Sequence, residues 1–184
     1  MNDTLKVIAD RYSCRDFKDT PLSDGQIETL VNAALAAPSA VNRQPWRLVV
    51  IRDKTLIDEL DVEGMAVLAA SEDKDTYDRM LSRGGKLFYG APCLIYILSD
   101  GSKWGMLDSG ILCQNIAIAA QSIGLATCIV GMAAIPINGP KGGEIKRRLK
   151  FPEGVEFAVG ILAGTANSGK EPHELDPGKV VYVN

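Results

Sequence analysis

The feature of this sequence that most restricts its fold is a long stretch without charge. No charged side chain occurs from Ser109 to Pro140. Polar residues such as Gln114 and Asn115 interrupt this stretch and Gly124 breaks it, whereas a membrane-spanning helix needs about 20 mostly apolar residues with interfacial anchors. The stretch therefore predicts, in residues 104–123, a helix that is buried on all sides, in either a domain core or a subunit interface.

The chain as a whole has the composition of a globular domain. Its 184 residues are 46% hydrophobic and 23% charged, which allows one domain over residues 1–184 with a core of its own. The net charge of −3 gives no indication that the protein binds nucleic acid or an anionic membrane. The single histidine, His173, excludes a His-rich zinc site and is the only candidate for a Ser-His-Asp triad, so we expect no metal.

The cysteines and the N-terminus indicate where the protein works. The four cysteines are scattered without a Cys-x-x-Cys pair, and Cys93 and Cys128 lie in apolar runs typical of buried thiols. Residues 1–15 are charged and contain no apolar signal-peptide core. Together these features predict a protein of the reducing cytoplasm.

Local patterns predict an α+β fold, with one sheet and helices packed on it. The best-defined helix lies between Pro21 and Pro38, where Ser23 and Gln26 match a capping box. Four runs rich in β-forming residues predict buried strands at 46–51, 93–98, 125–130 and 156–163. Strands and helices do not alternate strictly, so a mixed sheet is expected rather than a doubly wound parallel one.

The remaining segments have weaker signals. Residues 53–89 are mostly helical in pattern, with breaks at Gly64 and at Gly84-Gly85. Residues 137–143 are predicted to form a loop and 144–149 a short basic helix, and residues 167–178 are a polar loop. A terminal strand at 180–183 follows, which pairs either at home or with the sheet of a partner.

A first polar cluster follows a short N-terminal helix. Arg11 and Arg15 bracket a hydroxyl in the run Arg11-Tyr12-Ser13-Cys14-Arg15. Guanidinium groups match phosphate oxygens in two-pronged hydrogen bonds, so the cluster suits a phosphate. A solvated basic turn is the alternative. The usual glycine-rich phosphate motifs of Rossmann folds and nucleotide hydrolases are missing from the chain.

A second polar cluster links the capped helix to the first strand. Ser39, Asn42 and Gln44 supply a hydroxyl and two amides between Pro38 and Pro45. Such uncharged groups suit the polar edge of a planar heterocycle, while ordinary turn formation is the alternative.

Isolated residues elsewhere allow two interpretations each. Lys86 is either a surface lysine or a ligand contact, and Asp108 is either a buried partner or a first-turn carboxylate. Gly131 after the third strand either brings backbone N–H groups close to a ligand or only makes a turn. Lys170 and His173 are donors in a loop that is otherwise expected to be solvent-exposed.

Taken together, these motifs resemble the nitroreductase family in its short form. The resemblance covers nearly the whole chain in order: Arg11-x-Ser13-x-Arg15, then Pro38-Ser-Ala-Val-Asn42-Arg-Gln44-Pro-Trp46, then Gly90-Ala-Pro92, then Gly124-Leu125. The second of these stretches is the most specific part. The resemblance implies an α+β fold with a mixed, mainly antiparallel sheet, in an intertwined homodimer with two FMN sites at the subunit interface.

The resemblance also implies roles for individual residues. Arg11 and Arg15 would hold the FMN phosphate with help from Tyr12 and Ser13, and Lys170 or His173 would complete that site. From the other subunit, the flavin would be contacted by Pro38, Ser39, Asn42 and Gln44. Lys86 would contact the pyrimidine edge, and Val130 and Gly131 would lie beside the ring.

The implied activity is an FMN-dependent oxidoreductase. NADH or NADPH would reduce the flavin and leave, and a small oxidant (a nitroaromatic, a quinone or a flavin) would then accept the electrons. The flavin carries this chemistry, which fits a chain with one histidine. A non-enzymatic flavin-binding sensor or carrier on the same fold is the alternative, and a plain interaction domain is a third.

Overall fold

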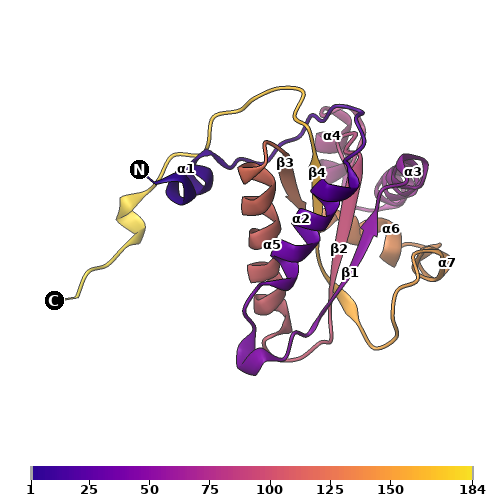
Figure 1. The fold of residues 1–184 in the computed structure, drawn as a ribbon. Coiled ribbons are helices and arrows are strands. Elements are labelled where there is room, and N and C mark those ends of the chain that lie inside the picture. Colours follow the sequence, from indigo (N-terminus) through magenta and orange to yellow (C-terminus); the bar gives the residue numbers. More distant parts are fainter. Residues whose placement is uncertain (1, 184) are drawn as a thin grey trace.

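Four antiparallel strands form the centre of the molecule (Figure 1). The structure is a computed structural model that describes residues 2–183. The strand order in the sheet is β1-β2-β4-β3, and a parallel bridge between Ser13 and Thr127 adds a further contact at the β3 edge. This arrangement confirms the predicted α+β class and the mixed, mainly antiparallel sheet. The strands are β1 (Trp46–Ile51), β2 (Cys93–Ser99), β3 (Ala126–Val130) and β4 (Glu156–Gly164).

Helices cover both faces of the sheet, which is why β2 is buried along its whole length. Because side chains alternate along a strand, Cys93, Ile95 and Ile97 face one core and Leu94, Tyr96 and Leu98 the other. In Figure 1, α2 and α5 lie on one side of the sheet, and α3, α6 and α7 on the other. The helices are α1 (Asp3–Asp10), α2 (Asp24–Leu35), α3 (Lys54–Ala70), α4 (Lys74–Leu81), α5 (Gly105–Ser122), α6 (Ala134–Asn138) and α7 (Gly142–Arg148). Short 3₁₀ turns are η1 (Ala40–Asn42), η2 (Gly131–Ala133) and η3 (Pro177–Lys179).

The sequence located α2 and α5 within a residue or two. The Ser23 hydroxyl accepts a hydrogen bond from the Gln26 N–H at 3.3 Å, and the Gln26 side chain accepts one from the Ser23 N–H at 2.9 Å, so the predicted capping box is present. Within one chain α5 is not buried on all sides, because Gly110 and Gln114 are exposed, so burial in a domain core alone is not observed. The alternative that the helix lies in a subunit interface stays a prediction. Met106 and Leu107, just before the charge-free part of α5, are 53% and 58% exposed.

Two sequence predictions, one about a helix break and one about a loop, are wrong. Helix α3 continues through Gly64, so this glycine is no break. A Cβ at this position would lie 2.3 Å from Leu87 Cδ1, which shows that the glycine serves close packing. The α3–α4 break comes at residues 71–73 instead. The predicted loop at 137–143 contains the end of α6 and the start of α7. Residues 180–183 form no strand with their own chain, so pairing at home is not observed and pairing with the sheet of a partner stays a prediction.

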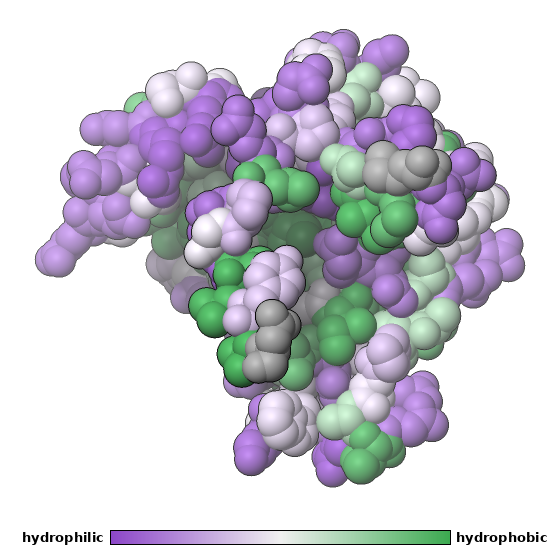
Figure 2. All heavy atoms as spheres, turned by 90° about the vertical axis from the view of Figure 1, so that its left-hand side faces the viewer, coloured by the Kyte–Doolittle hydropathy of each residue, from purple (hydrophilic) through white to green (hydrophobic). Residues whose placement is uncertain are grey.

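The two ends of the chain extend away from the sheet on the α5 side (Figure 1). Figure 2 looks at that side and shows hydrophobic residues gathered in the middle of the face. Large apolar side chains are exposed on α1 and on the C-terminal segment: Leu5, Ile8, Leu175, Val181, Tyr182 and Val183. Among residues 2–183, no helix has both the length and the hydropathy needed to cross a bilayer.

Candidate functional site

The segment with the first polar cluster runs beside the edge strand β3. Ser13 forms a parallel bridge with Thr127, and the Cys14 N–H donates to the Thr127 carbonyl at 2.9 Å. Buried Cys14 and Phe17 anchor the segment in the core, while Arg15 is exposed. The backbone pairing therefore fixes Arg15 beside the last residues of β3.

Arg15 shares a cavity of about 340 Å³ with the end of β3. Val130 and Gly131 line the same cavity, and so do two arginines from outside both polar clusters, Arg79 and Arg83, whose local sequence does not mark them as site residues. A Cβ added to Gly131 would meet nothing within 4 Å, so its backbone is open to a ligand. Three guanidinium groups around open backbone make this cavity suited to an anionic, planar molecule.

The start of the C-terminal loop is tied to the same segment. The Tyr12 hydroxyl donates to the Ser168 carbonyl at 3.2 Å, and the Ser168 hydroxyl donates to Asp16 at 3.1 Å. As a result Lys170 lines a hollow of about 540 Å³ together with Tyr12. His173 is exposed and lines none of the cavities described for residues 2–183. The structure thus brings Lys170, and not His173, to the first polar cluster.

The second polar cluster forms a strained loop. Val41, Asn42 and Gln44 have φ angles of 48°, 56° and 49°, in the left-handed region that is unfavourable for β-branched Val41 above all. The Ser39 hydroxyl accepts from the Gln44 N–H at 2.9 Å, and the Gln44 amide donates to Asn42 Oδ1 at 3.0 Å. Backbone strain of this kind persists only where the surroundings hold it, and it is common at ligand sites.

Asp108 anchors this loop to the start of α5. The carboxylate is 3% exposed and accepts from the Ala40 N–H at 3.2 Å and 3.3 Å through its two oxygens. Of the two interpretations of Asp108, the structure supports the buried partner. The first cluster, in contrast, pairs with β3, which follows the C-terminal end of α5. The two clusters are therefore anchored toward opposite ends of α5.

Lys86 lies in the turn before β2 and is exposed, with Leu87 and Phe88 buried directly after it. The buried Asp61 on α3 holds this turn, because its carboxylate accepts from the Phe88 N–H at 3.1 Å. Asp61 is 4% exposed and its second oxygen has no partner within the described residues. Burial raises the pKa of Asp61 to about 6, against the opposing effects of the Phe88 and Leu87 N–H groups and of the Lys86 charge.

Asp61→Asn should change how stability depends on pH. The pKa of Asp61 is raised from 3.8 to about 6, so the unfolded chain releases this proton first and the folded state loses stability as pH rises from about 4 to 6. The loss is on the order of 3 kcal/mol and is complete above pH 7. Urea unfolding should show the free-energy difference between Asp61→Asn and wild type rising over that window and then staying level. A difference that is the same at pH 4 and pH 8 would contradict this prediction.

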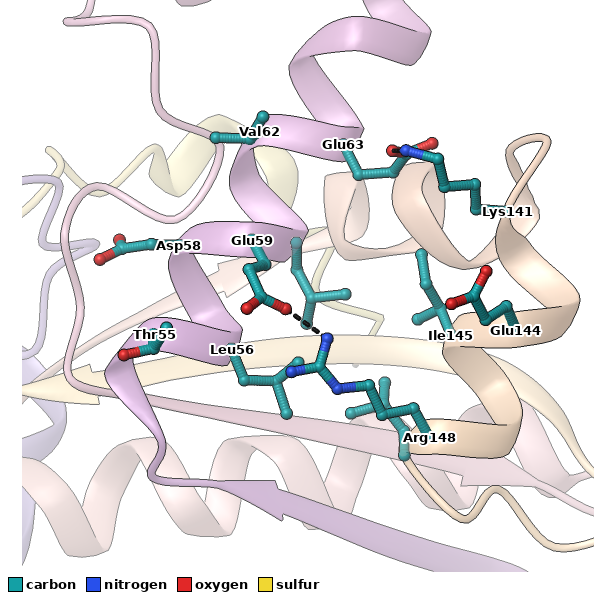
Figure 3. Close-up of a pocket in the computed structure, with 12 residues that line it drawn as sticks. Thr55, Leu56, Asp58, Glu59, Val62, Glu63, Lys141, Glu144, Ile145 and Arg148 are labelled. Carbon is teal, nitrogen blue, oxygen red and sulfur yellow. Dashed lines mark hydrogen bonds and ion pairs between the residues drawn. The ribbon is translucent and has the colours of Figure 1, made fainter.

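A second cavity, of about 560 Å³, lies between α3 and α7 on the opposite face of the sheet from α5 (Figure 3). Ion pairs cross it: Lys141 to Glu63 at 2.6 Å, and Arg148 to Glu59. Figure 3 shows Ile145 between these pairs and Leu56 beside the Glu59–Arg148 pair. The charged groups that span the cavity are thus used to join α7 to α3, and exposed ion pairs of this kind contribute little energy each.

Known proteins with similar sequences and structures match this chain over most or all of its length. The sequence model of the Nitroreductase family matches residues 8–164. A crystal structure of a nitroreductase with bound FMN from Desulfitobacterium hafniense DCB-2 is 46% identical, covers 100% of both chains and has a TM-score of 0.95.

Two further relatives have names that refer to different substrates. The chain is 27% identical to a 4-nitrobenzoate reductase from Pseudomonas putida, over 96% of this chain and 94% of that protein. It is also 27% identical to an FMN reductase (NADPH) from Bacillus subtilis (strain 168), over 99% of this chain and 73% of that protein. The match across most of its length and the shared fold lead to one conclusion: this chain belongs to the nitroreductase family.

Proposed function

We propose that this protein is an FMN-dependent oxidoreductase that takes electrons from NADH or NADPH and reduces a small oxidant, a nitroaromatic, a quinone or a flavin. One observation carries the proposal: Arg15 from the first polar cluster and the open backbone of Gly131 line one cavity. The site combines cations with exposed backbone N–H groups, as a phosphorylated planar cofactor requires. The FMN-bound relative at 46% identity supports the same cofactor here.

The residues present fit FMN in the following roles. Arg11 and Arg15 hold the phosphate, with Tyr12 and Ser13 from the same segment. The contact of the C-terminal loop with Tyr12 favours Lys170 over His173 as the residue that completes the phosphate site.

A second copy of the chain supplies the rest of the site in this proposal. Pro38, Ser39, Asn42 and Gln44 lie at the far end of α5 from Arg15, so one chain does not surround a single flavin with both clusters. The exposed apolar residues of α5, Met106 and Leu107, are then part of the dimer interface. Obligate interfaces are apolar in this way, which also accounts for the charge-free stretch.

In this proposal the residues of the chain bind the cofactor and stabilise charge on it. When bound, FMN supplies the hydride chemistry, so no protein acid or base is needed for it. The Gly131 N–H stays free to donate toward the flavin ring, and Lys86 provides a positive charge near the pyrimidine edge. Such fixed donors stabilise negative charge that develops during reduction. Asp61 holds the Lys86 turn through the Phe88 N–H.

Lys86→Ala should lower the two-electron reduction potential of bound FMN. Removing a positive charge near the reduced, anionic ring costs about 1–2 kcal/mol, which corresponds to a shift of roughly 20–40 mV for two electrons. The potential is measured by anaerobic titration against reference dyes. Arg147→Ala is the matched control, because Arg147 is an exposed cation on α7. An unchanged potential in Lys86→Ala would remove this residue from the flavin site.

Two measurements test the proposed function. The purified protein should show the absorbance spectrum of a flavin, and a colourless protein that takes up no FMN would indicate an interaction domain. Anaerobic mixing with NADH or NADPH should then bleach the flavin, and the oxidant should restore its colour. A flavin that neither nucleotide reduces would favour the sensor or carrier. Parallel double-reciprocal plots would support release of the nicotinamide before the oxidant binds.

A further inference from the structure

The cavity beside Gly131 has more positive charge than a single phosphate site explains. Arg79 lies in the last turn of α4, Arg83 lies four residues later in the following turn, and Arg15 lines the cavity from another segment. Its lining contains no carboxylate. Within residues 2–183, none of these three arginines forms an ion pair.

The position of Arg79 and Arg83 costs energy unless a negative group sits between them. Arg79 lies in the last turn of α4 and Arg83 in the turn beyond it, and both line one cavity, where like charges repel each other. The C-terminal end of α4 offsets part of this repulsion, because helix dipoles favour cations there. That local effect does not account for Arg15, which comes from a distant segment and lines the same cavity.

The buried thiol of Cys128 is influenced by the same positive charges. Burial raises the pKa of Cys128, and the charges of Arg15, Arg11 and Arg83 act against that rise. Cys128 itself lines the cavity, so these guanidinium charges converge on the space beside β3. Within residues 2–183, the Arg79 guanidinium makes one side-chain hydrogen bond, to the Thr76 hydroxyl at 2.9 Å, and its other N–H groups can donate to a ligand.

We propose that Arg79 and Arg83 form an anion subsite of the active site, which binds a carboxylate or phosphate group on a substrate of the proposed reaction. This inference rests on the proposed function, because it places a substrate next to FMN held by Arg11 and Arg15. Two sources of the anionic group fit: the 2′-phosphate by which NADPH differs from NADH, and a carboxylate on the oxidant. The relative named for 4-nitrobenzoate reduces a substrate with such a carboxylate.

The test measures binding to the oxidised holoenzyme, where no electron transfer takes place. Four non-reacting probes are titrated while the flavin absorbance is recorded: NADP⁺ against NAD⁺, and benzoate against neutral benzamide. In at least one pair we expect wild type to prefer the member with the additional negative group, NADP⁺ or benzoate, and the pair that shows the preference identifies the source of the anion. In Arg79→Gln/Arg83→Gln that preference should fall by about tenfold or more, as expected for a lost charge-assisted contact.

A matched control and a second readout keep the result specific. Arg147→Gln removes an exposed guanidinium from α7 and should keep the wild-type preference. A wild type without preference in either pair, or a double variant that keeps it, would overturn the subsite. The dissociation constant of FMN is measured in parallel, so that loss of cofactor is recognised. Failure of the proposed function would instead appear as a wild-type flavin that neither NADH nor NADPH bleaches.

Discussion

Replacing Arg15 with glutamine should weaken the binding of FMN to the apoprotein by about 10- to 100-fold. A hydrogen bond to a charged group contributes about 1.5–3 kcal/mol, and leaving the phosphate without its guanidinium partner removes that contribution. The side chain is exposed and makes no ion pair within the described residues, so the variant should fold as wild type does. Titration of apoprotein with FMN, followed by quenching of flavin fluorescence, measures the effect.

Two further variants separate geometry from charge at this position. Arg15→Lys keeps the charge but loses the two-pronged donor, so it should recover only part of the affinity. Arg147→Gln lowers the net charge equally on α7 and should leave the dissociation constant within about twofold of wild type, because exposed charges at a distance are screened. If Arg15→Gln binds FMN as tightly as wild type, Arg15 does not contact the phosphate.

The parts of the fold that the sequence predicted are those fixed by local patterns. The capping box at Ser23 and Gln26 needs only residues three apart, and it is present as expected. The β2 run from Cys93 to Leu98 is apolar on both faces because helices cover both sides of the sheet, and this also follows from composition alone. Motif order then gave the family, and the match over residues 8–164 confirms it.

The parts that the sequence did not predict depend on contacts between distant segments. Asp61 lies next to Leu60 on a helix, and nothing local indicates that its carboxylate holds the turn at Phe88. Arg79 and Arg83 resemble ordinary surface residues until the fold places Arg15 at the same cavity. Arg83 even lies beyond the end of α4, in the turn that follows, so helical spacing does not explain why it joins Arg79 at this cavity.

The glycines between α6 and α7 illustrate the same limit. Residues 137–143 are predicted to form a loop, yet Gly142 and Gly143 begin α7. A Cβ on Gly142 would lie 2.3 Å from the Ile137 carbonyl oxygen, whereas a Cβ on Gly143 would meet nothing within 4 Å. Of these two neighbouring glycines, Gly142 has no room for a side chain and Gly143 does, and the sequence does not distinguish them.

Gly142→Ala should therefore destabilise the protein by about 2–3 kcal/mol, at the upper end for an overpacked site. The contact is with backbone, so no side-chain rotation relieves it and the α6–α7 turn must open. For a chain of this size the melting temperature should fall by roughly 5–10 °C. Gly143→Ala is the control in the same helix: it adds only helix propensity, so it should raise stability by up to about 1 kcal/mol. Thermal unfolding of both variants checks the pair, and equal shifts in the same direction would contradict the close approach of Gly142 to Ile137.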